Sequence, residues 1–360
     1  MAILIVILTI LSCSPEKDKS FGNYRLKEKL LYGIQSKLMD VSGIFYADEI
    51  PIVYKLDNNV ILFHDVEQDK LIKKVTIPIF TKFNSIDIIS ANHFAYFADS
   101  SFFVFKNDVL TEYTLEHFDS TRLVLPYHKI KYFPSLAKIS CVTISLLERS
   151  PNQLPYDEPC IAIYDLKKQI VSPSKLKYPK IYHDNKLAIP KMYFSKSNKD
   201  LLVSFSYSDN IFKVNIETGL VDSISINTTY KSDKAYYDPS KSKAEKLDML
   251  NKNQINASSY GIAFYSEKEK KYFRIFRPGM PIKDGNRYLT SLDAGCWILE
   301  LNEKNKIAKE YKLPNGVYFL SDGWSYNTVN KSINYLKVYP YDEKIDVWIF
   351  NLHSLFLYNF

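Results

Sequence analysis

Glycine, arginine and cysteine are scarce in this chain, whose 360 residues include ten glycines, six arginines and four cysteines. So few glycines argue against a nucleotide site built on a glycine-rich phosphate-binding loop. The sequence also lacks the Gly-x-Ser-x-Gly and His-Glu-x-x-His motifs of common hydrolases, and its six histidines include no pair at metal-ligand spacing. We therefore predict no catalytic residues, no metal site and no cofactor.

The net charge of +7 comes from lysines that are spread along the chain. They usually stand beside acidic residues, as in the run Glu267-Lys268-Glu269-Lys270-Lys271. A nucleic-acid surface more often gathers Arg and Lys on one element. The pattern favours a solvated, lysine-rich surface and predicts no nucleic-acid partner.

A long apolar run is present at the start of the chain. Residues 2–11 are almost wholly apolar, which suits a secretory signal but is too short to span a bilayer. The run ends at Leu11-Ser12-Cys13, which resembles a bacterial lipobox, and polar residues 14–20 follow. The resemblance implies a signal peptide over 1–12, palmitate on Cys13 and a lipidated tether over 13–22. A buried N-terminal strand with an incidental cysteine is the alternative.

The residues directly after Cys13 add to this expectation. Glu16, Lys17 and Asp18 resemble the surface-export signal of Bacteroidetes lipoproteins. The resemblance implies a protein anchored to the bacterial outer membrane through its lipid, facing the periplasm or the cell surface.

Three cysteines remain beyond Cys13, so at least one thiol is free. Cys141 and Cys160 fall on neighbouring predicted strands, where a disulfide is geometrically possible. Two buried free cysteines are the interpretation that we favour.

A pattern of short apolar or aromatic runs recurs along the chain. Its copies centre on Phe63, Phe105, Tyr164, Val214, Leu299 and Phe350, at spacings of 42, 59, 50, 85 and 51 residues. These spacings bracket the repeats of about 40–50 residues that form β-propeller blades. The 85-residue gap holds either an insertion or a further blade.

Similar runs precede and follow most of these centres, separated by polar turns, as in antiparallel meanders. The central runs are apolar on nearly every residue, as expected where neighbouring sheets cover both faces. We predict an all-β fold, a single β-propeller domain over 23–360 with six four-stranded blades. The run 24–34 is expected to pair with the last blade and close the ring. Repeated acids in the turns, such as Asp57 and Asp99, are interpreted as turn residues.

The central runs and the lipobox, together with two further segments, resemble a known family. The segments are Ser259-Tyr260-Gly261-Ile262-Ala263-Phe264-Tyr265 and Lys271-Tyr272-Phe273-Arg274-Ile275-Phe276-Arg277. The chain is similar to the Bacteroidetes lipoproteins grouped as domain of unknown function 4221, which are TolB-like six-bladed propellers. The resemblance implies a lipid-anchored propeller without an assigned activity, and it supplies no catalytic residues.

Half of all arginines, Arg274, Arg277 and Arg287, lie within fourteen residues of one another. The planar guanidinium suits carboxylate or phosphate recognition, so these residues are candidate ligand contacts. Surface ion pairs with Glu267, Glu269 or Asp284 are the alternative.

Two more features accompany the arginines. Residues 227–259 read as a mostly non-strand insertion, either a lid or disordered, in which Ser242 and Glu245 fit a capping box. Trp324, after Asp322-Gly323 and between predicted strands, is a candidate for stacking against a ligand.

These features favour a binding or interaction module that uses one face of the propeller. Its expected partners are a carbohydrate, an anionic small molecule or an envelope protein. A propeller-type carbohydrate-active enzyme, a glycosidase or lyase, is one alternative, and a structural accessory of an envelope complex is the other.

Overall fold

The computed structural model describes the strands and part of the connections between them. The described residues are 19–21, 24–35, 42–47, 50–57, 59–65, 68, 70–80, 83–99, 101–114, 130–142, 158–185, 192–226, 241–242, 244–245, 256–267, 269–281, 283–284, 287–288, 295–302, 304, 306–313, 318–327, 332–338 and 347–357. The chain forms two compact units, Met1–Ile77 with Val317–Phe360, and Pro78–Gly316. Cys13 and the predicted signal peptide lie outside the described residues.

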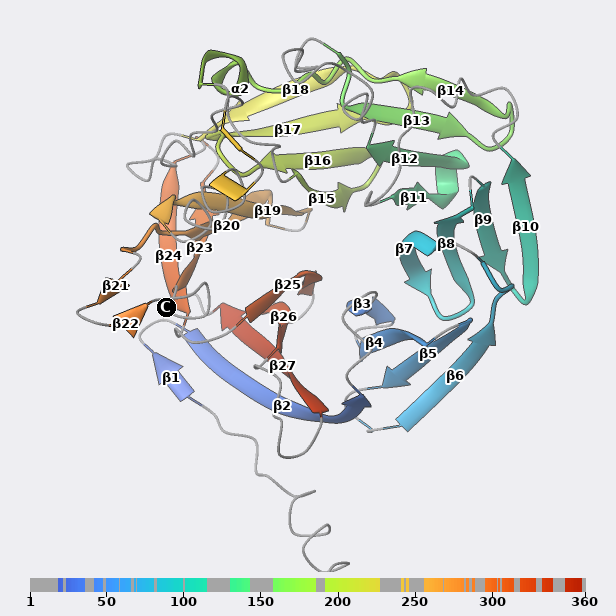
Figure 1. Ribbon diagram of the computed structural model, residues 1–360, viewed down its shortest axis with the longest axis horizontal. Helices are drawn as coiled ribbons and strands as arrows, with labels where there is room; N and C mark the ends of the chain where they lie inside the picture. Colours follow the sequence, from blue (N-terminus) through green and yellow to red (C-terminus); the bar gives the residue numbers. More distant parts are fainter. Residues whose placement is uncertain are drawn as a thin grey trace, which may run out of the picture. The chain divides into compact units, whose positions relative to one another are not determined.

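The first unit contains two antiparallel sheets (Figure 1). One has the order β1 (Lys19–Phe21), β2 (Tyr24–Gln35), β27 (Val347–Leu357), β26 (Ser332–Val338) and β25 (Tyr318–Asn327). The other has the order β3 (Ser42–Ala47), β4 (Ile50–Asp57), β5 (Val60–Asp65) and β6 (Lys70–Thr76). Strand β2 pairs with β27 from Tyr24 opposite Leu357 to Gln35 opposite Val347. The predicted pairing of the N-terminal run with the last sheet is therefore confirmed.

The second unit contains four antiparallel sheets of four strands each. The first sheet has β7 (Phe83–Ser90), β8 (His93–Ala98), β9 (Ser101–Lys106) and β10 (Val109–Thr114), and the second has β11 (Lys131–Phe133), β12 (Lys138–Val142), β13 (Ile161–Asp165) and β14 (Ile170–Pro173). The third has β15 (Met192–Ser197), β16 (Asp200–Phe205), β17 (Asn210–Asn215) and β18 (Val221–Ser225). The fourth has β19 (Ser259–Ser266), β20 (Lys271–Arg277), β23 (Cys296–Leu301) and β24 (Ile307–Leu313). The hairpin β21 (Lys283–Asp284) and β22 (Arg287–Tyr288), the helix α2 (Lys180–Asn185) and the 3-10 turn η2 (Pro134–Leu136) complete the unit.

The predicted all-β, propeller-like fold is confirmed, with six sheets of at least four strands in the described part of the chain. All six predicted centres fall on the third strand of their sheet: β5, β9, β13, β17, β23 and β27. One sheet has five strands instead of four because β1 extends it. The long gap holds the insertion, which ends at residue 258 because Ser259 begins β19, and the segment with β21 and β22. The single-domain organisation over 23–360 stays a prediction.

Burial on both faces explains the continuous apolar runs. Every residue of β16 is buried, and in β9 only the last residue, Lys106, is exposed. The outer strand β10, in contrast, is almost wholly exposed. Aromatic residues fill the space between neighbouring strands, for example Tyr96 stacked on Phe103 with ring centroids 4.9 Å apart. Such cross-strand aromatic pairs stabilise the sheet beyond their buried area.

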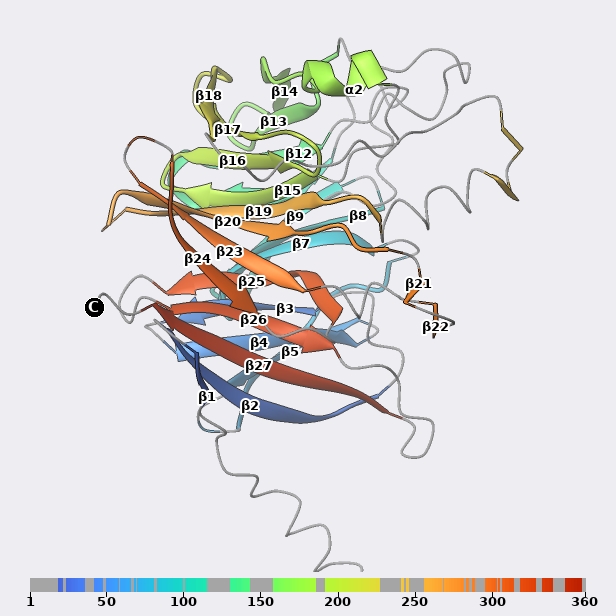
Figure 2. The ribbon, with the colours of Figure 1, turned by 90° about the vertical axis from the view of Figure 1, so that its left-hand side faces the viewer.

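The connections of the second unit differ in length between its two ends. We call one end the turn end, where every connection has two to five residues: 91–92, 107–108, 134–137, 166–169, 198–199, 216–220, 267–270 and 302–306. At the opposite end, the loop end, five connections have sixteen residues or more: 115–130, 143–160, 174–191, 226–258 and 278–295. Figure 2 shows α2, β21 and β22 at the loop end. Two short connections, 99–100 and 206–209, also lie there.

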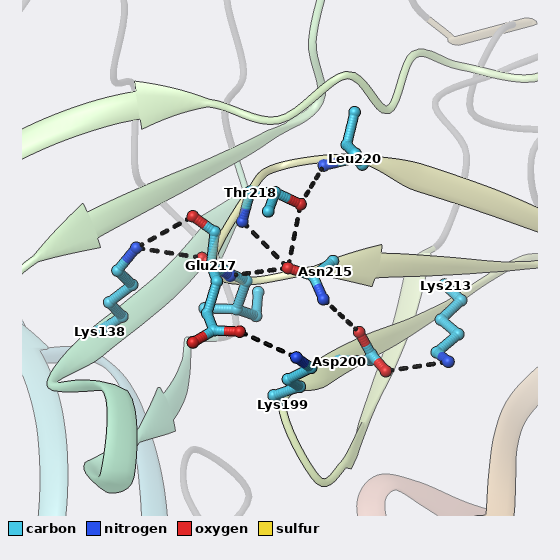
Figure 3. Close-up of polar contacts among 9 residues, drawn as sticks. Lys138, Lys199, Asp200, Lys213, Asn215, Glu217, Thr218 and Leu220 are labelled. Atoms are coloured by element: carbon cyan, nitrogen blue, oxygen red, sulfur yellow. Dashed lines mark hydrogen bonds and ion pairs between the residues drawn. The ribbon is translucent and has the colours of Figure 1, made fainter.

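Side-chain hydrogen bonds hold the turns of the turn end (Figure 3). Asn215 Oδ1 accepts from the backbone N–H groups of Glu217 at 3.1 Å and Thr218 at 3.0 Å. Its amide donates to Asp200 Oδ1 at 3.2 Å, and Lys213 Nζ lies 3.0 Å from Asp200 Oδ2. These carboxylates and amides act as turn residues. The same role applies to Asp99 at the loop end, which has a left-handed φ of 49°.

The three cysteines in the described part of the chain form no disulfide. Cys141, Cys160 and Cys296 are free and buried, which confirms the favoured state of the first two. Burial raises the pKa of the Cys141 thiol to about 12, so the reactive thiolate is rare at neutral pH. Within the described residues, no helix has the length and apolar character needed to cross a membrane.

Deleting residues 345–360 tests whether the chain is one cooperative domain. The deletion removes β27, which lies between β2 and β26, so we expect loss of the native circular dichroism spectrum of the whole chain. Deleting only residues 358–360, which follow β27, is the control and should leave the spectrum unchanged. A protease-resistant fragment spanning 78–316 with native β signal would show that the two units fold separately.

Candidate functional site

A cluster of polar and aromatic side chains surrounds Arg274 beside the loop end of the second unit. Arg274 stands in the middle of β20, a strand that lies between β19 and β23 and is buried over its four central residues. The side chain of Arg274 is 0% exposed. A guanidinium group in such a place must find all its hydrogen-bond acceptors inside the protein.

Arg274 donates to the neighbouring sheet. Its Nε and Nη2 groups lie 3.1 and 2.9 Å from Ser204 Oγ on β16. Nη2 also donates to the carbonyls of Phe205 at 3.3 Å and Ser208 at 2.8 Å, and Nη1 donates to the carbonyl of Asp209 at 2.9 Å. These carbonyls belong to β16 and its turn into β17. The guanidinium therefore fixes the shape of that turn through these hydrogen bonds.

Tyr260 and Gly261, on β19, complete the cluster. The guanidinium carbon of Arg274 lies 3.8 Å from the centroid of the Tyr260 ring, a cation–π contact. Ser204 Oγ donates to the Gly261 carbonyl at 2.6 Å, and the Tyr260 N–H donates to the Ser206 carbonyl at 2.8 Å. A side chain at Gly261 would bring a Cβ to 3.0 Å from the Cβ of Ile275, so the close approach of β19 and β20 favours glycine.

Burial lowers the pKa of Arg274 to about 10, while the neighbouring Tyr260, Asp209 and Tyr182 favour its charged form. The guanidinium therefore stays charged at neutral pH. Tyr182 is also fully buried, burial raises the pKa of its hydroxyl, and that hydroxyl accepts from the Tyr207 N–H at 3.1 Å. The hydrogen-bond acceptors of the cation are the Ser204 hydroxyl and three backbone carbonyls, and the face of Tyr260 lies against it.

Arg277 occupies a different position at the end of the same strand. It pairs in register with Ser259, the first residue of β19, and its side chain is partly exposed. Burial raises the pKa of Tyr207, and the positive charge of Arg277 opposes that rise. Arg277 and Tyr207 both stand at the loop end.

Arg287 and Trp324 are the other two predicted ligand contacts. Arg287 lies in β22, opposite Asp284 of β21, within the loop-end connection 278–295. Trp324 lies in β25 of the first unit, opposite Tyr335, so the expectation that it falls between strands is wrong. For Arg274 the ion-pair alternative is also wrong, because its acceptors are a hydroxyl and three carbonyls. The ligand-binding roles predicted for Arg274, Arg277, Arg287 and Trp324 stay predictions.

Most of the insertion lies outside the described residues, but its capping box is described. The Ser242 N–H donates to Glu245 Oε2 at 2.9 Å, and the Glu245 N–H donates to Ser242 Oγ at 3.3 Å. The predicted capping box is confirmed. Within the described residues, no group of three or more His, Cys, Asp or Glu side chains could hold a metal ion.

Comparison with known proteins places the chain in a family. The model of a domain of unknown function, DUF4221, matches residues 101–295. The chain belongs to the DUF4221 family. A solved DUF4221 protein from Bacteroides vulgatus shares 13% identity, with a TM-score of 0.62 over 92% of this chain and 99% of that chain. This likeness shows the fold, and the predicted family resemblance is confirmed.

Other comparisons are more distant. Hydrazine synthase from Kuenenia stuttgartiensis is similar at 12% identity and a TM-score of 0.45, over 85% of this chain and 78% of that chain. None of the curated proteins matches this DUF4221 chain.

The structure gives a physical meaning to the segments that carried the family resemblance. Tyr260, Gly261 and Arg274 all belong to the cluster that joins the β15–β18 sheet to the β19–β24 sheet. Sequence reasoning found these residues but treated Arg274 only as a ligand contact or a surface ion pair. The central position of Arg274 in an otherwise apolar strand was the signal for burial.

Replacing Arg274 by Met should destabilise this DUF4221 protein strongly. The variant loses five hydrogen bonds, among them those to the Ser208 and Asp209 carbonyls. We expect the free energy of unfolding, measured with urea, to fall by about 3 kcal/mol or more. Lys304→Met, at an exposed turn, is the control and should change it by less than about 0.5 kcal/mol. An Arg274→Met protein as stable as this control would contradict the assignment.

Proposed function

We propose that this DUF4221 protein is a lipid-anchored binding module of the bacterial outer membrane, and that its ligand contacts the loop end of the Pro78–Gly316 unit. The unequal length of the connections is the observation that carries the proposal. Long connections on a rigid β scaffold commonly carry binding residues, because they vary without disturbing the core. The turn end, with its short hydrogen-bonded turns, offers no comparable variation.

An anionic ligand, such as an acidic saccharide or a carboxylate-bearing peptide, fits the side chains at the loop end. Arg277 is partly exposed there and offers the planar donors that suit carboxylates, and Arg287 belongs to the loop-end hairpin. Tyr207 and Tyr193 are partly exposed at the same end and can pack against a sugar ring. Arg274 is assigned to the support of this surface, because all its described contacts are internal.

The carbohydrate-active enzyme hypothesis expects a carboxyl group with a raised pKa to act as a general acid. Asp87, a buried carboxylate on β7, has the opposite property. Burial alone would raise its pKa, but the ammonium groups of Lys131 and Lys196 together lower it. This observation favours binding over catalysis at that residue.

Binding of oligogalacturonate to Arg277 variants tests the proposed ligand class. We expect Arg277→Gln to weaken binding about tenfold or more in isothermal titration calorimetry, because it removes one charge-assisted contact of about 1.5–3 kcal/mol. Lys304→Met, at the turn end, is the matched control and should bind as the unaltered protein does.

Equal affinity for oligogalacturonate and for a neutral oligosaccharide of the same length would contradict an anionic ligand. Unchanged affinity in Arg277→Gln would contradict the placement of the ligand at the loop end.

Lipidation is tested separately at Cys13. The lipobox resemblance leads us to expect that Cys13→Ala accumulates as unprocessed precursor and takes up no labelled palmitate. The unaltered protein should be labelled and should fractionate with membranes. Labelled palmitate in Cys13→Ala, or soluble unaltered protein, would contradict the anchor.

A further inference from the structure

The strand β10 forms the outer edge of the sheet β7–β10, and no strand in the described part of the chain pairs with that edge (Figure 1). On its inner side β10 is in register with β9 over its whole length. Five of its six residues are exposed, among them Val109 at 63% and Leu110 at 36%. The strand therefore presents aliphatic side chains beside a row of backbone groups, and an edge of this kind is a template for a further strand.

The fourth strands of the other three sheets of this unit carry features that discourage such pairing. Strand β14 has four residues and ends in Pro173, and β18 has five residues. Strand β24 contains Lys309 and Lys312, and its pairing with β23 includes a register shift. Short length, proline, lysine and irregular register all reduce pairing at an edge. Strand β10 has six residues in regular register and contains neither lysine nor proline, so it is the fourth strand best suited to accept a partner.

The turn before β10 determines which of its backbone groups point outward. Asn107 and Asp108 have positive φ angles of 50° and 64°, as in the two-residue type I′ turn of a β-hairpin. Lys106 and Val109 flank this turn and form a hydrogen-bonded pair, and such pairs alternate along an antiparallel ladder. The odd-numbered residues of β10 therefore direct their N–H and C=O groups to β9, and the even-numbered residues direct theirs to the outer edge.

The sequence of β10 is complementary to itself in one antiparallel register. In this register Thr111 of one copy lies opposite Thr111 of a second copy, and Val109 lies opposite Tyr113. Thr–Thr pairs and pairs of an aromatic with a β-branched residue are favourable across two strands. Leu110 lies opposite Glu112, and because both residues direct their backbone groups outward, each such pair can form two hydrogen bonds.

Charge favours this register over its neighbours. A shift by two residues in one direction places Glu112 opposite Glu112, and the same shift in the other direction places Glu112 opposite Asp108. Like charges directly opposite each other destabilise a sheet. A shift by one residue would place opposite side chains on different faces, which a two-fold axis perpendicular to the sheet does not allow.

We propose that β10 pairs antiparallel with β10 of a second copy of this chain, with Thr111 opposite Thr111, so that two four-stranded sheets join into one of eight strands. The contact uses the same surface on both copies, so it closes as a dimer and does not propagate. It covers the exposed Val109 and Leu110 and gives partners to the outward backbone groups. This interface goes beyond the proposed function and uses none of the loop-end residues.

Light scattering of the full chain in detergent tests the dimer. The chain carries Cys13→Ala, so that no lipid contributes to association. We expect twice the chain mass of 41.9 kDa at a protein concentration of about 100 μM, because an edge of six residues makes a small interface that binds weakly. A monomer at this concentration would overturn the proposal.

A lysine at the centre of the interface should weaken the dimer. Thr111→Lys places two ammonium groups opposite each other, so we expect the dissociation constant to rise about tenfold or more. Thr114→Lys is the matched control, because it makes the same change at the end of the same strand and places the lysine opposite Asp108. Equal dissociation constants for the two variants would contradict the proposed register.

Oxidative cross-linking tests the register independently of the strength of the dimer. In Thr111→Cys the two introduced thiols face each other at a non-hydrogen-bonded position, where the Cα atoms are about 4.5 Å apart. We expect a disulfide-linked dimer on a non-reducing gel. Thr114→Cys should stay monomeric on this gel, because its two thiols are separated by about 20 Å along the strands. The native Cys141, Cys160 and Cys296 are buried and should not cross-link.

Reaction of the introduced thiol of Thr111→Cys with a soluble thiol reagent separates the other possible occupants of the edge. A monomer whose introduced thiol reacts rapidly would leave the edge open to a strand of another protein. A monomer whose introduced thiol does not react would show that the chain covers its own edge. Either result would overturn the proposal, as would equal cross-linking of Thr111→Cys and Thr114→Cys.

Discussion

Hydrogen bonds from the side chains of one sheet to the backbone of the next are the interaction on which the Pro78–Gly316 unit depends. Each sheet ends in a first strand whose outer N–H and C=O groups lack a partner strand. Ser85 Oγ accepts from the Ile130 N–H at 3.0 Å, and Asp87 accepts from the Tyr132 N–H. In the same way, Ser204 on β16 donates to the Gly261 carbonyl on β19 of the next sheet. Each such bond avoids a buried unsatisfied group, which would cost about 1–3 kcal/mol.

These bonds allow the first strands of the sheets to be short. Strand β11 has only three residues, yet its edge amides are satisfied by the sheet before it. The loop-end connection 174–191 also contributes to the core, because Leu176, Tyr178 and Tyr182 are buried in it. Arg274 connects the sheets to the loop end, because it donates hydrogen bonds to carbonyls of the 205–209 segment, which contains Tyr207.

The third strands were predictable from the sequence, and most of the first strands were not. A third strand such as β9 is covered on both faces, so its residues form the continuous apolar run SFFVF, which stands out in any reading. A first strand such as β15, MYFSKS, carries Ser195 and Lys196 because it must bond to neighbouring sheets, and its pattern resembles a loop. The capping box at Ser242 was predictable because it is local. The burial of Arg274 was not predicted, because its acceptors are 65 to 70 residues away in sequence.

Arg274 and the two lysines that contact Asp87 differ in how far their side chains reach solvent. Arg274 is 0% exposed, makes five hydrogen bonds within the chain and lies over the Tyr260 ring, which fits a supporting role. Lys131 and Lys196 contact the same carboxylate, that of Asp87, and the side chains of both lysines are partly exposed. Sequence reasoning favoured arginine for anion recognition because its fork is specific. In this fold the Arg274 guanidinium holds the 205–209 turn, and Lys131 and Lys196, which the sequence presents as surface charges, contact a buried carboxylate of another sheet.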